Sequence, residues 1–353
     1  MKRSKAYFIN GGAGRVICSI PAFEKLLETE KDFIIVCEGG MDFYKGHPQL
    51  HARAYDNWHK GLFEEHIKDR DIISPEPYRV WEYYNQKCNL SQAFDILINN
   101  QGIRDLPSPN IVLNKVEISM AYNVIKEIKE KTGSDKVLVI QPFGRGIQNT
   151  GDLLIDASSR SMHLTNVIEI INELKKEYAV VVMNEFPIAL EEEPSEQYPV
   201  AMPQISDIRI WAGIIEMADH FVGCDSVGQH IAKSFGKTAT VILGATYPIN
   251  VSYLDDPNFD IIDLGKDKRI YDPIRISMED HINRLNDELM EMDKFQIQNL
   301  LQVIRKRLGK PTKIKKSILP KPENNIHSKD KEATPPMFST AGGVLTPLKQ
   351  GNM

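Results

Sequence analysis

The chain begins with a short apolar run that leads directly into a cluster of glycines. Residues 6–10 have the composition of a buried strand, residues 11–14 read Gly-Gly-Ala-Gly, and residues 16–31 carry apolar side chains at helical spacing. A second apolar run, residues 33–37, ends at a Glu-Gly-Gly turn. Consecutive strand, helix and strand favour a parallel sheet, because parallel neighbours need a crossover connection. The opening therefore predicts an α/β fold.

The same alternation restarts after Gly133. We expect strands over residues 136–140, 178–183, 220–223, 238–243 and 259–264, and helices over residues 116–131, 164–176, 208–217 and 226–235. Residues 41–110 are irregular, and we expect one strand in them, near residues 94–99. Residues 278–308 are predicted to be mostly helical. The repeated pattern predicts two doubly wound, Rossmann-like domains, residues 1–133 and 134–308.

The charge of the chain is unevenly distributed. The formal net charge of −5 combines +8 on residues 305–353, with eleven Lys and Arg against three Asp and Glu, and −13 on residues 1–304. An acidic body argues against a whole-protein electrostatic grip on nucleic acid. Residues 309–353 contain six prolines and few large apolar side chains, which predicts a disordered tail. We expect the basic segment 305–331 to contact a protein partner, a membrane surface or nucleic acid.

The cysteines and the apolar runs indicate a cytoplasmic, soluble protein. Cys18, Cys37, Cys88 and Cys224 are widely spaced and form no CxxC pair, which favours reduced thiols. No apolar run approaches the roughly 20 residues that span a bilayer, so we expect membrane contact only at the inner surface, if at all. The histidines between residues 47 and 66 lack metal-ligand spacing, and no metal site is predicted.

Two glycine-rich turns are candidate phosphate sites. Gly12 and Gly14 precede a helix whose first N–H groups are open to an anion. This turn is not the dinucleotide fingerprint, which would need a third glycine where Ile17 stands. In the second half, Gly144 and Arg145 follow the strand 136–140, and Arg145 would supply positive charge to a diphosphate. An ordinary tight turn is the alternative for both.

The most informative block is residues 221–232, Phe-Val-Gly-Cys-Asp-Ser-Val-Gly-Gln-His-Ile-Ala. A strand ends at its glycine and a helix begins near Ser226, so Asp225 or Ser226 can cap that helix. His230 follows Ser226 by one turn and shares its face. A hydroxyl, backbone amides and an imidazole would then converge at the carboxyl edge of a sheet, where open α/β sheets bind ligands. A plain helix cap and a structural histidine remain the alternatives.

Glu185 follows the strand 178–183 at the same expected edge of the sheet. A carboxylate in that place can accept hydrogen bonds from ribose hydroxyls. The alternative is an exposed charge in a loop.

Together these motifs resemble a known family. Their order is Gly12-x-Gly14 followed by Pro21-Ala22, then Pro142-x-Gly144, then Gly-x-Asp-Ser-x-x-x-His-x-Ala over residues 223–232, then Phe-Gly-Lys-Thr and Gly-Ala-Thr. The chain is similar in this to the heptosyltransferase-type enzymes of glycosyltransferase family 9, which have the GT-B fold. The resemblance covers roughly residues 5–300 and is most specific over residues 215–248.

The resemblance implies an N-terminal acceptor domain and a C-terminal nucleotide-sugar domain facing a cleft. Asp225 would contact sugar hydroxyls, Ser226 and the amides up to Gly228 would hold the diphosphate, and His230 would lie beside them. The helix over 278–308 would cross back to the first domain. The co-substrate would be a nucleoside diphosphate sugar, the acceptor a glycan or another hydroxyl compound, and no metal or further cofactor is implied.

The sequence departs from the family pattern at the expected general base. The family has an aspartate at the position of Arg15, and an arginine cannot act as a base at neutral pH. Glu38 and Asp42, after the second strand, are the nearest candidate bases, and Arg15 would bind an anionic acceptor group or the leaving phosphate. Val227 stands where the family has a glycine, which here follows at Gly228.

Three functions are compatible with these features. The first is an inverting, metal-independent glycosyltransferase that moves a hexosyl or heptosyl group from a nucleoside diphosphate to a hydroxyl. The second, favoured by Arg15, is a catalytically weakened GT-B protein that binds a nucleotide sugar or a partner. The third is a glycosyltransferase acting on DNA that is held by the basic tail. The net charge of −13 on residues 1–304 argues against this function.

Overall fold

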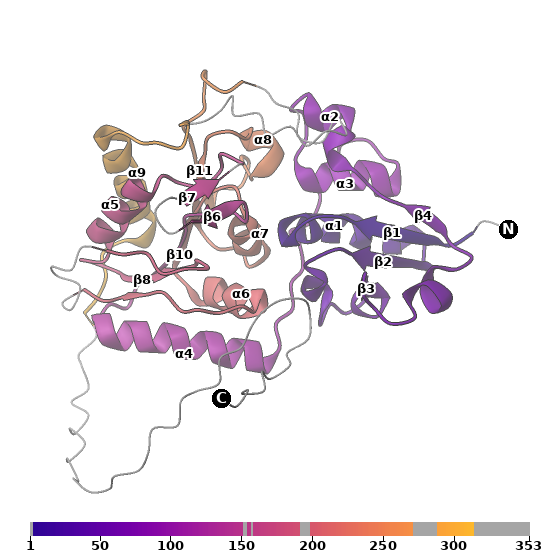
Figure 1. The fold of residues 1–353 in the computed structure, drawn as a ribbon, viewed down its shortest axis with the longest axis horizontal. Helices are drawn as coiled ribbons and strands as arrows, with labels where there is room; N and C mark the ends of the chain where they lie inside the picture. Colours follow the sequence, from indigo (N-terminus) through magenta and orange to yellow (C-terminus); the bar gives the residue numbers. More distant parts are fainter. Residues whose placement is uncertain (1–2, 151–153, 157, 191–197, 271–287, 314–353) are drawn as a thin grey trace, which may run out of the picture. The chain divides into compact units, whose positions relative to one another are not determined.

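The computed structural model describes residues 3–150, 154–156, 158–190, 198–270 and 288–313 (Figure 1). These residues belong to one compact unit, in which two parallel sheets are covered by helices. The predicted α/β class is confirmed. Residues 314–353, which hold most of the predicted tail, lie outside the described residues. No helix in the described ranges has the length and apolar character to cross a membrane.

The first sheet contains the N-terminal strands in the order β3-β2-β1-β4, all parallel. Its strands are β1 (Lys5–Ile9), β2 (Phe33–Cys37), β3 (Ala54–Asp56) and β4 (Asp71–Ile73). Successive side chains of a strand point to opposite faces. Tyr7 therefore packs edge-on against Phe23 of α1 (Ala13–Thr29), whereas Ala6 lies on the other face with Leu62 of the π-helical segment η3 (Leu62–Ile67).

The second sheet has the order β12-β11-β10-β5-β8-β9 and is also parallel. Its strands are β5 (Val137–Gln141), β8 (Ala179–Val182), β9 (Val200–Ala201), β10 (His220–Gly223), β11 (Ala239–Leu243) and β12 (Phe259–Asp263). A separate antiparallel hairpin is formed by β6 (Ile147–Asn149) and β7 (Leu154–Asp156). Gln141 is paired with Gly223, so β5 and β10 end at the same edge of the sheet.

Helices cover both faces of the second sheet (Figure 1). One face packs with α4 (Lys115–Thr132), α6 (Ile208–Met217) and α7 (Val227–Ser234), and the other with α5 (Leu164–Leu174) and α9 (Lys294–Leu308). The valines at 137 and 139 face the first group, and Leu138 and Ile140 face the second. The shorter helices are η1 (Met41–Tyr44), η2 (His51–Arg53), η4 (Pro77–Arg79), α2 (Trp81–Tyr84), α3 (Leu90–Asn99) and α8 (Pro248–Val251).

The strand predicted near residues 94–99 is wrong. This stretch is the second half of α3, which begins at a capping box: Asn89 accepts from the Gln92 amide and the Gln92 side chain accepts from the Asn89 amide. Ala93 and Phe94 are buried against α1, as a helical face requires. The other predicted strands and helices are found within two residues of their expected bounds, except the first helix, which begins three residues earlier than expected, and the last.

The last predicted helix is shorter than expected. Residues 278–287 lie outside the described residues, residues 288–293 are not helical, and α9 begins after the cap residue Asp293. The resemblance implied that this helix crosses back to the first domain. That crossing stays a prediction. The described helix, α9, packs on α5 and β10, with Leu300 and Ile304 in the core of the second sheet.

The helices and loops around the first sheet contact those around the second sheet. One buried apolar cluster includes Phe23 on α1 and Ile231 on α7. The Asn250 amide donates to the carbonyls of Tyr83 and Cys88, 2.8 and 2.9 Å away. Helix α4 precedes the predicted boundary at residues 133–134 but packs along α6 and against β8. The division into domains 1–133 and 134–308 stays a prediction.

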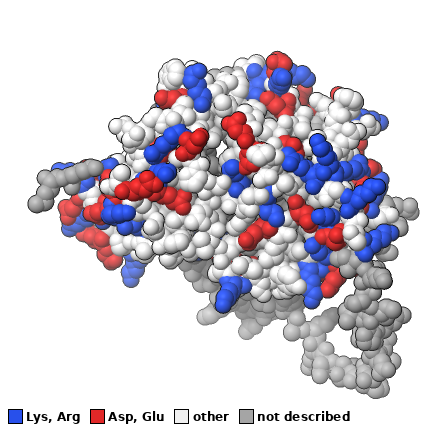
Figure 2. All heavy atoms as spheres, turned by 180° about the vertical axis from the view of Figure 1, so that it is seen from behind, with Lys and Arg blue, Asp and Glu red and all other residues white. Residues whose placement is uncertain are grey.

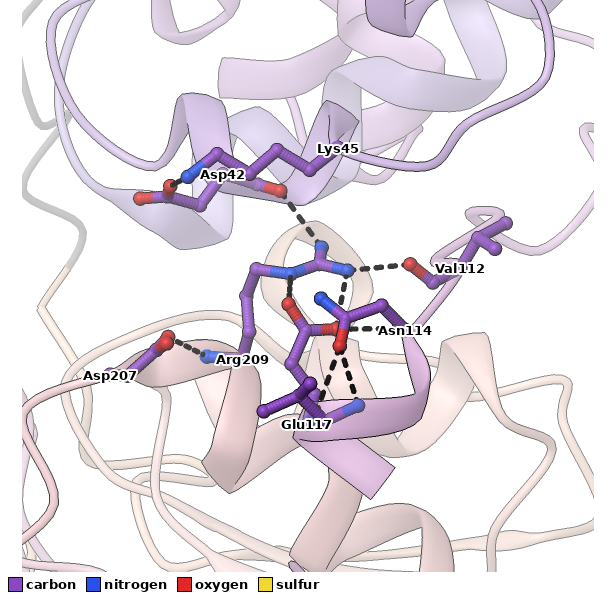
Figure 3. A network of polar contacts seen from close by, with 8 residues as sticks. Asp42, Lys45, Val112, Asn114, Glu117, Asp207 and Arg209 are labelled. Atoms are coloured by element: carbon purple, nitrogen blue, oxygen red, sulfur yellow. Dashed lines mark hydrogen bonds and ion pairs between the residues drawn. The ribbon is translucent and has the colours of Figure 1, made fainter. Parts of the chain in front are cut away.

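A buried arginine connects these parts (Figure 3). Arg209, 2% exposed, donates through Nε and Nη2 to both carboxylate oxygens of Glu117 on α4, at 2.6 and 2.9 Å. Its Nη2 also donates to the Val112 carbonyl and its Nη1 to the Asp42 carbonyl, at 2.5 and 2.8 Å. Asp42 belongs to η1, after β2, so one guanidinium joins α6, α4 and a loop of the first sheet.

Replacing Arg209 by Met should lower the free energy of unfolding by about 3–5 kcal/mol, because Glu117 would keep a buried, unpaired charge. Lys45→Met is the matched control: it removes only the half-exposed ion pair with Asp42, worth at most about 1 kcal/mol. Urea denaturation at neutral pH measures both, and equal losses would contradict a special role for Arg209. Glu117→Leu added to Arg209→Met should recover part of the loss.

Candidate functional site

The glycine turn after β1 leads into α1 without a side-chain cap. Gly12 is the N-cap residue and makes no side-chain cap. The Glu38 carboxylate, from the end of β2, accepts a hydrogen bond from the Gly11 amide at 2.5 Å. Gly40, with a φ of 78°, approaches so closely that a Cβ there would lie 2.7 Å from the Ala13 Cα. The loop after β2 is thus packed against the turn, and only glycine fits this contact.

The turn at the start of α7 is held by hydrogen bonds from the Gln141 side chain, at the end of β5. Its Nε2 donates to the Ser226 hydroxyl at 3.1 Å, and its Oε1 accepts from the Gly228 amide at 2.9 Å. A Cβ on Gly228 would lie 2.4 Å from both Gln141 Oε1 and Phe221 Cζ. Close packing therefore requires glycine at position 228. Ser226 is the N-cap, but its hydroxyl does not cap the helix, and the Gly228 amide of the first turn is capped by the Gln141 side chain instead.

The two turns meet each other. A Cβ on Gly14 would lie 3.2 Å from His230 Cδ2 and 3.9 Å from the Val227 Cα, and a Cβ on Gly12 would lie 3.3 Å from Arg145 Nη1. The N-termini of α1 and α7 thus come together with a guanidinium and an imidazole. Both helix ends carry partial positive charge, an arrangement suited to phosphate.

His230 is held in this contact. Its Nδ1 lies 2.8 Å from the Tyr253 hydroxyl and 3.5 Å from the Cys18 sulfur. Burial lowers the pKa of His230 to about 4, so the ring is neutral at pH 7. Burial also raises the pKa of the Cys18 thiol to about 12, which excludes a reactive thiolate at neutral pH. The sequence predicted that His230 and the Ser226 hydroxyl converge. In the structure the ring contacts Tyr253 and Cys18, whereas the Ser226 hydroxyl is bonded to Gln141.

Asp225 is buried and its nearest cation is Arg160. Burial raises the pKa of the Asp225 carboxyl, and Arg160, with Nη1 3.7 Å from Oδ2, partly opposes this. The Gln229 amide reaches Asp225 Oδ1 at 3.4 Å. Among the described residues, Arg160 Nε is buried without a hydrogen-bond partner. A buried unpaired donor beside a carboxylate is a good place for a ligand hydroxyl or phosphate oxygen.

The loop that carries Arg160 is shaped by Asp156. Its carboxylate accepts from the amides of Ser158, Arg160 and Ser161. Burial alone would raise the pKa of Asp156, but the hydrogen bonds from Ser158 and Ser161 outweigh it and lower that pKa. Ser161 Oγ accepts in turn from the Gly144 amide at 3.0 Å, so the predicted Gly144–Arg145 turn is tied to the same loop.

Arg15 is not exposed to this space. It is 6% exposed, and its Nη1 donates to Glu76 at 3.0 Å. The guanidinium also lies over the rings of Tyr78 and Phe94, with its Cζ 5.0 and 5.6 Å from their centroids. A charge paired and covered in this way is poorly placed for the predicted role of binding an acceptor anion or leaving phosphate.

The remaining predicted residues are dispersed. The Asp42 carboxylate forms an ion pair with Lys45, while its carbonyl accepts from Arg209. Glu185 is exposed after β8, and its amide donates to the Asn184 side chain at 3.0 Å. Among the described residues, no group of three or more His, Cys, Asp or Glu side chains is placed to hold a metal ion.

Several residues of the site were not predicted. Gln141 supports the α7 turn, Arg160 lies near Asp225, Glu76 pairs with Arg15, and Tyr253 contacts His230. For Gln141, the place at the end of β5 was the available signal. The other three lie in segments with no recognisable motif, and only the three-dimensional contacts reveal them.

Comparison with known proteins supports the fold. No protein-family model and no curated protein matches the sequence. A glycosyl transferase family 9 structure from Veillonella parvula DSM 2008 has a TM-score of 0.61 at 12% identity, over 86% of this chain and 98% of that one. The ADP-heptose LPS heptosyltransferase II of E. coli has a TM-score of 0.59 at 13% identity, over 87% and 98%. The chain has the GT-B fold of these structures. The resemblance to heptosyltransferase-type enzymes is confirmed at the level of the fold.

Gly228→Ala should destabilise the protein by about 1–3 kcal/mol, because the added methyl group overlaps Gln141 and Phe221. Gly102→Ala is the matched control: no atom lies within 4 Å of a Cβ at that position. Thermal unfolding of the two variants beside the unaltered protein measures the difference. A Gly228→Ala protein as stable as Gly102→Ala would contradict the packing of the α7 turn.

Proposed function

We propose that the protein is a glycosyltransferase that moves a sugar from a nucleoside diphosphate to a hydroxyl acceptor, with inversion and without a metal. The observation that carries the proposal is the meeting of the α1 and α7 N-termini with Arg145 and His230, in a chain with the GT-B fold. Backbone N–H groups and a guanidinium stabilise the charge that develops on a leaving diphosphate, so a metal ion is not needed for that task.

The second half would bind the donor. The α7 turn at Ser226–Gly228 and Arg145 would hold the diphosphate, and Gly144 would let the backbone approach it. Asp225 and the free Arg160 donor would bind sugar hydroxyls. Glu185, at the same edge of the sheet, would accept hydrogen bonds from the ribose.

The first half would bind the acceptor and supply the base. An inverting transfer needs a carboxylate that takes the proton of the attacking hydroxyl. Of the two predicted candidates, Glu38 reaches the glycine turn through the Gly11 amide, whereas the Asp42 carboxylate is paired with Lys45. We therefore assign the base to Glu38.

A panel of nucleotide sugars tests the proposal, with ADP-heptose first because the E. coli neighbour is named for that donor. At least one nucleoside diphosphate should raise the melting temperature of the full chain, and the matching sugar nucleotide should release its diphosphate. Arg145→Met should weaken the binding of that diphosphate about tenfold. Arg305→Met is the control: this arginine of α9 is paired with Glu177, and its replacement should leave the binding of the diphosphate unchanged.

No stabilisation by any nucleoside diphosphate would overturn the donor site. Stabilisation without turnover on any donor would favour the second candidate, a binding module. The binding module is favoured by Arg15. This residue occupies the helix position where the family has its carboxylate base, and it is paired with Glu76.

Glu38→Gln should reduce turnover by about 10²–10⁴-fold while leaving diphosphate binding within about twofold, because the amide oxygen can still accept from the Gly11 amide. Asp42→Asn is the matched control and should change turnover less than about threefold. Initial rates of diphosphate release measure both. Loss of activity in Asp42→Asn alone would move the base to that residue.

Transfer to DNA is the least supported of the three functions. On the face drawn in Figure 2, basic and acidic side chains are interspersed over the described surface. A polyanion is bound most favourably by a surface of one sign. This face therefore offers no support for binding DNA on the body of the protein.

A further inference from the structure

The two ring nitrogens of His230 have different surroundings. Nδ1 faces the Tyr253 hydroxyl at 2.8 Å and the Cys18 sulfur at 3.5 Å. The opposite edge lies against the glycine turn: a Cβ on Gly14 would be 3.2 Å from Cδ2 and 3.7 Å from Nε2. His230 is 6% exposed, yet none of the described residues forms a hydrogen bond with Nε2.

The contacts of Nδ1 decide where the ring proton lies. An imidazole nitrogen is a stronger acceptor than a thiol sulfur, and a phenol is a stronger donor than a thiol. Burial raises the pKa of Tyr253 well above its ordinary value, so the phenol keeps its proton. If Tyr253 donates to Nδ1, the neutral ring must carry its proton on Nε2. The reverse arrangement would direct the phenol proton toward the Cys18 sulfur, a weak acceptor.

We propose that Tyr253 is a positioning residue that holds His230 with its proton on Nε2, so that this N–H completes an anion site between the N-termini of α1 and α7. The class of ligand is the phosphate groups of a nucleotide, and in this respect the inference rests on the proposed function. The side chain of His230 is largely buried, and a phosphate oxygen at the glycine turn would supply the partner that its Nε2–H group lacks among the described residues.

The site would combine neutral and charged donors. His230 contributes a neutral N–H, because burial keeps the ring unprotonated at pH 7. The helix ends contribute backbone N–H groups and partial charge, and Arg145 contributes a full positive charge. Gly14 favours this arrangement, because a Cβ at that position would lie only 3.2 Å from His230 Cδ2 and would push the imidazole away from the turn.

Nitrogen NMR of the ligand-free full chain tests the positioning step directly. The protein is labelled with ¹⁵N-histidine at pH 7, and the His230 signals are assigned by their absence in His230→Gln. Nδ1 should show the shift of an unprotonated, hydrogen-bonded nitrogen and Nε2 that of a protonated one. Tyr253→Phe should move Nδ1 toward the shift of a free acceptor. Tyr44→Phe, which removes a buried phenol bonded to Ser19, is the matched control and should move neither signal.

Binding of ADP and of inorganic pyrophosphate, measured by calorimetry, tests the anion site. His230→Gln keeps an N–H donor at a similar reach and should bind within about threefold of the unaltered protein. His230→Leu should bind about tenfold more weakly, as expected for the loss of one hydrogen bond to a charged group. Tyr253→Phe should fall between them.

The outcomes separate this inference from the proposed function. A His230 proton on Nδ1 overturns the inference, whether or not ADP binds. Equal affinities of His230→Gln and His230→Leu overturn the anion site even if the tautomer is as expected. Failure of both ADP and pyrophosphate to bind the unaltered protein overturns the anion site and counts against the proposed function, while an Nε2 proton would still support the role of Tyr253.

Discussion

The relative position of the candidate turns depends on the buried guanidinium of Arg209. Its planar fork fixes the Glu117 carboxylate and the carbonyls of Val112 and Asp42 in one geometry. On one side, α6 carries Arg209 and packs against α7. On the other, the loop that contains Asp42 begins at Gly40, which touches Ala13 in the glycine turn. The network thus connects, by direct contacts, the two helix N-termini that form the candidate anion site.

Three arginines approach that site, and their partners separate their roles. Arg15 is paired with Glu76 and Arg160 lies near Asp225, so each charge is already balanced by a carboxylate. Arg145 is exposed and forms no ion pair among the described residues. Because only Arg145 of these three lacks a carboxylate partner among the described residues, an anionic ligand is favoured there. The neutral His230 would be a further donor.

Local patterns predicted most elements because each was encoded within a few residues. The strand–helix–strand order, the glycine that ends α4 and the strand that leads into Asp225 are of this kind. Residues 94–99 failed because a short apolar run fits a strand or a buried helix, and the deciding cap at Asn89 lies outside the run. Contacts such as Arg209 with Asp42 or His230 with Cys18 join residues 167 and 212 positions apart, and no periodicity encodes such pairs.

The change from aspartate to Arg15 has a consequence for the whole first half. An arginine buried in the first turn of α1 needs a carboxylate, and Glu76 supplies it from the loop before η4. That loop belongs to residues 41–110, the segment that resembles the family least. The block over residues 221–232 resembles the family most, and its turn is held by glycine packing and Gln141. A change of charge in the first half with the α7 turn kept in the second alters the surface of the first half first, because Arg15 and its partner Glu76 both lie there.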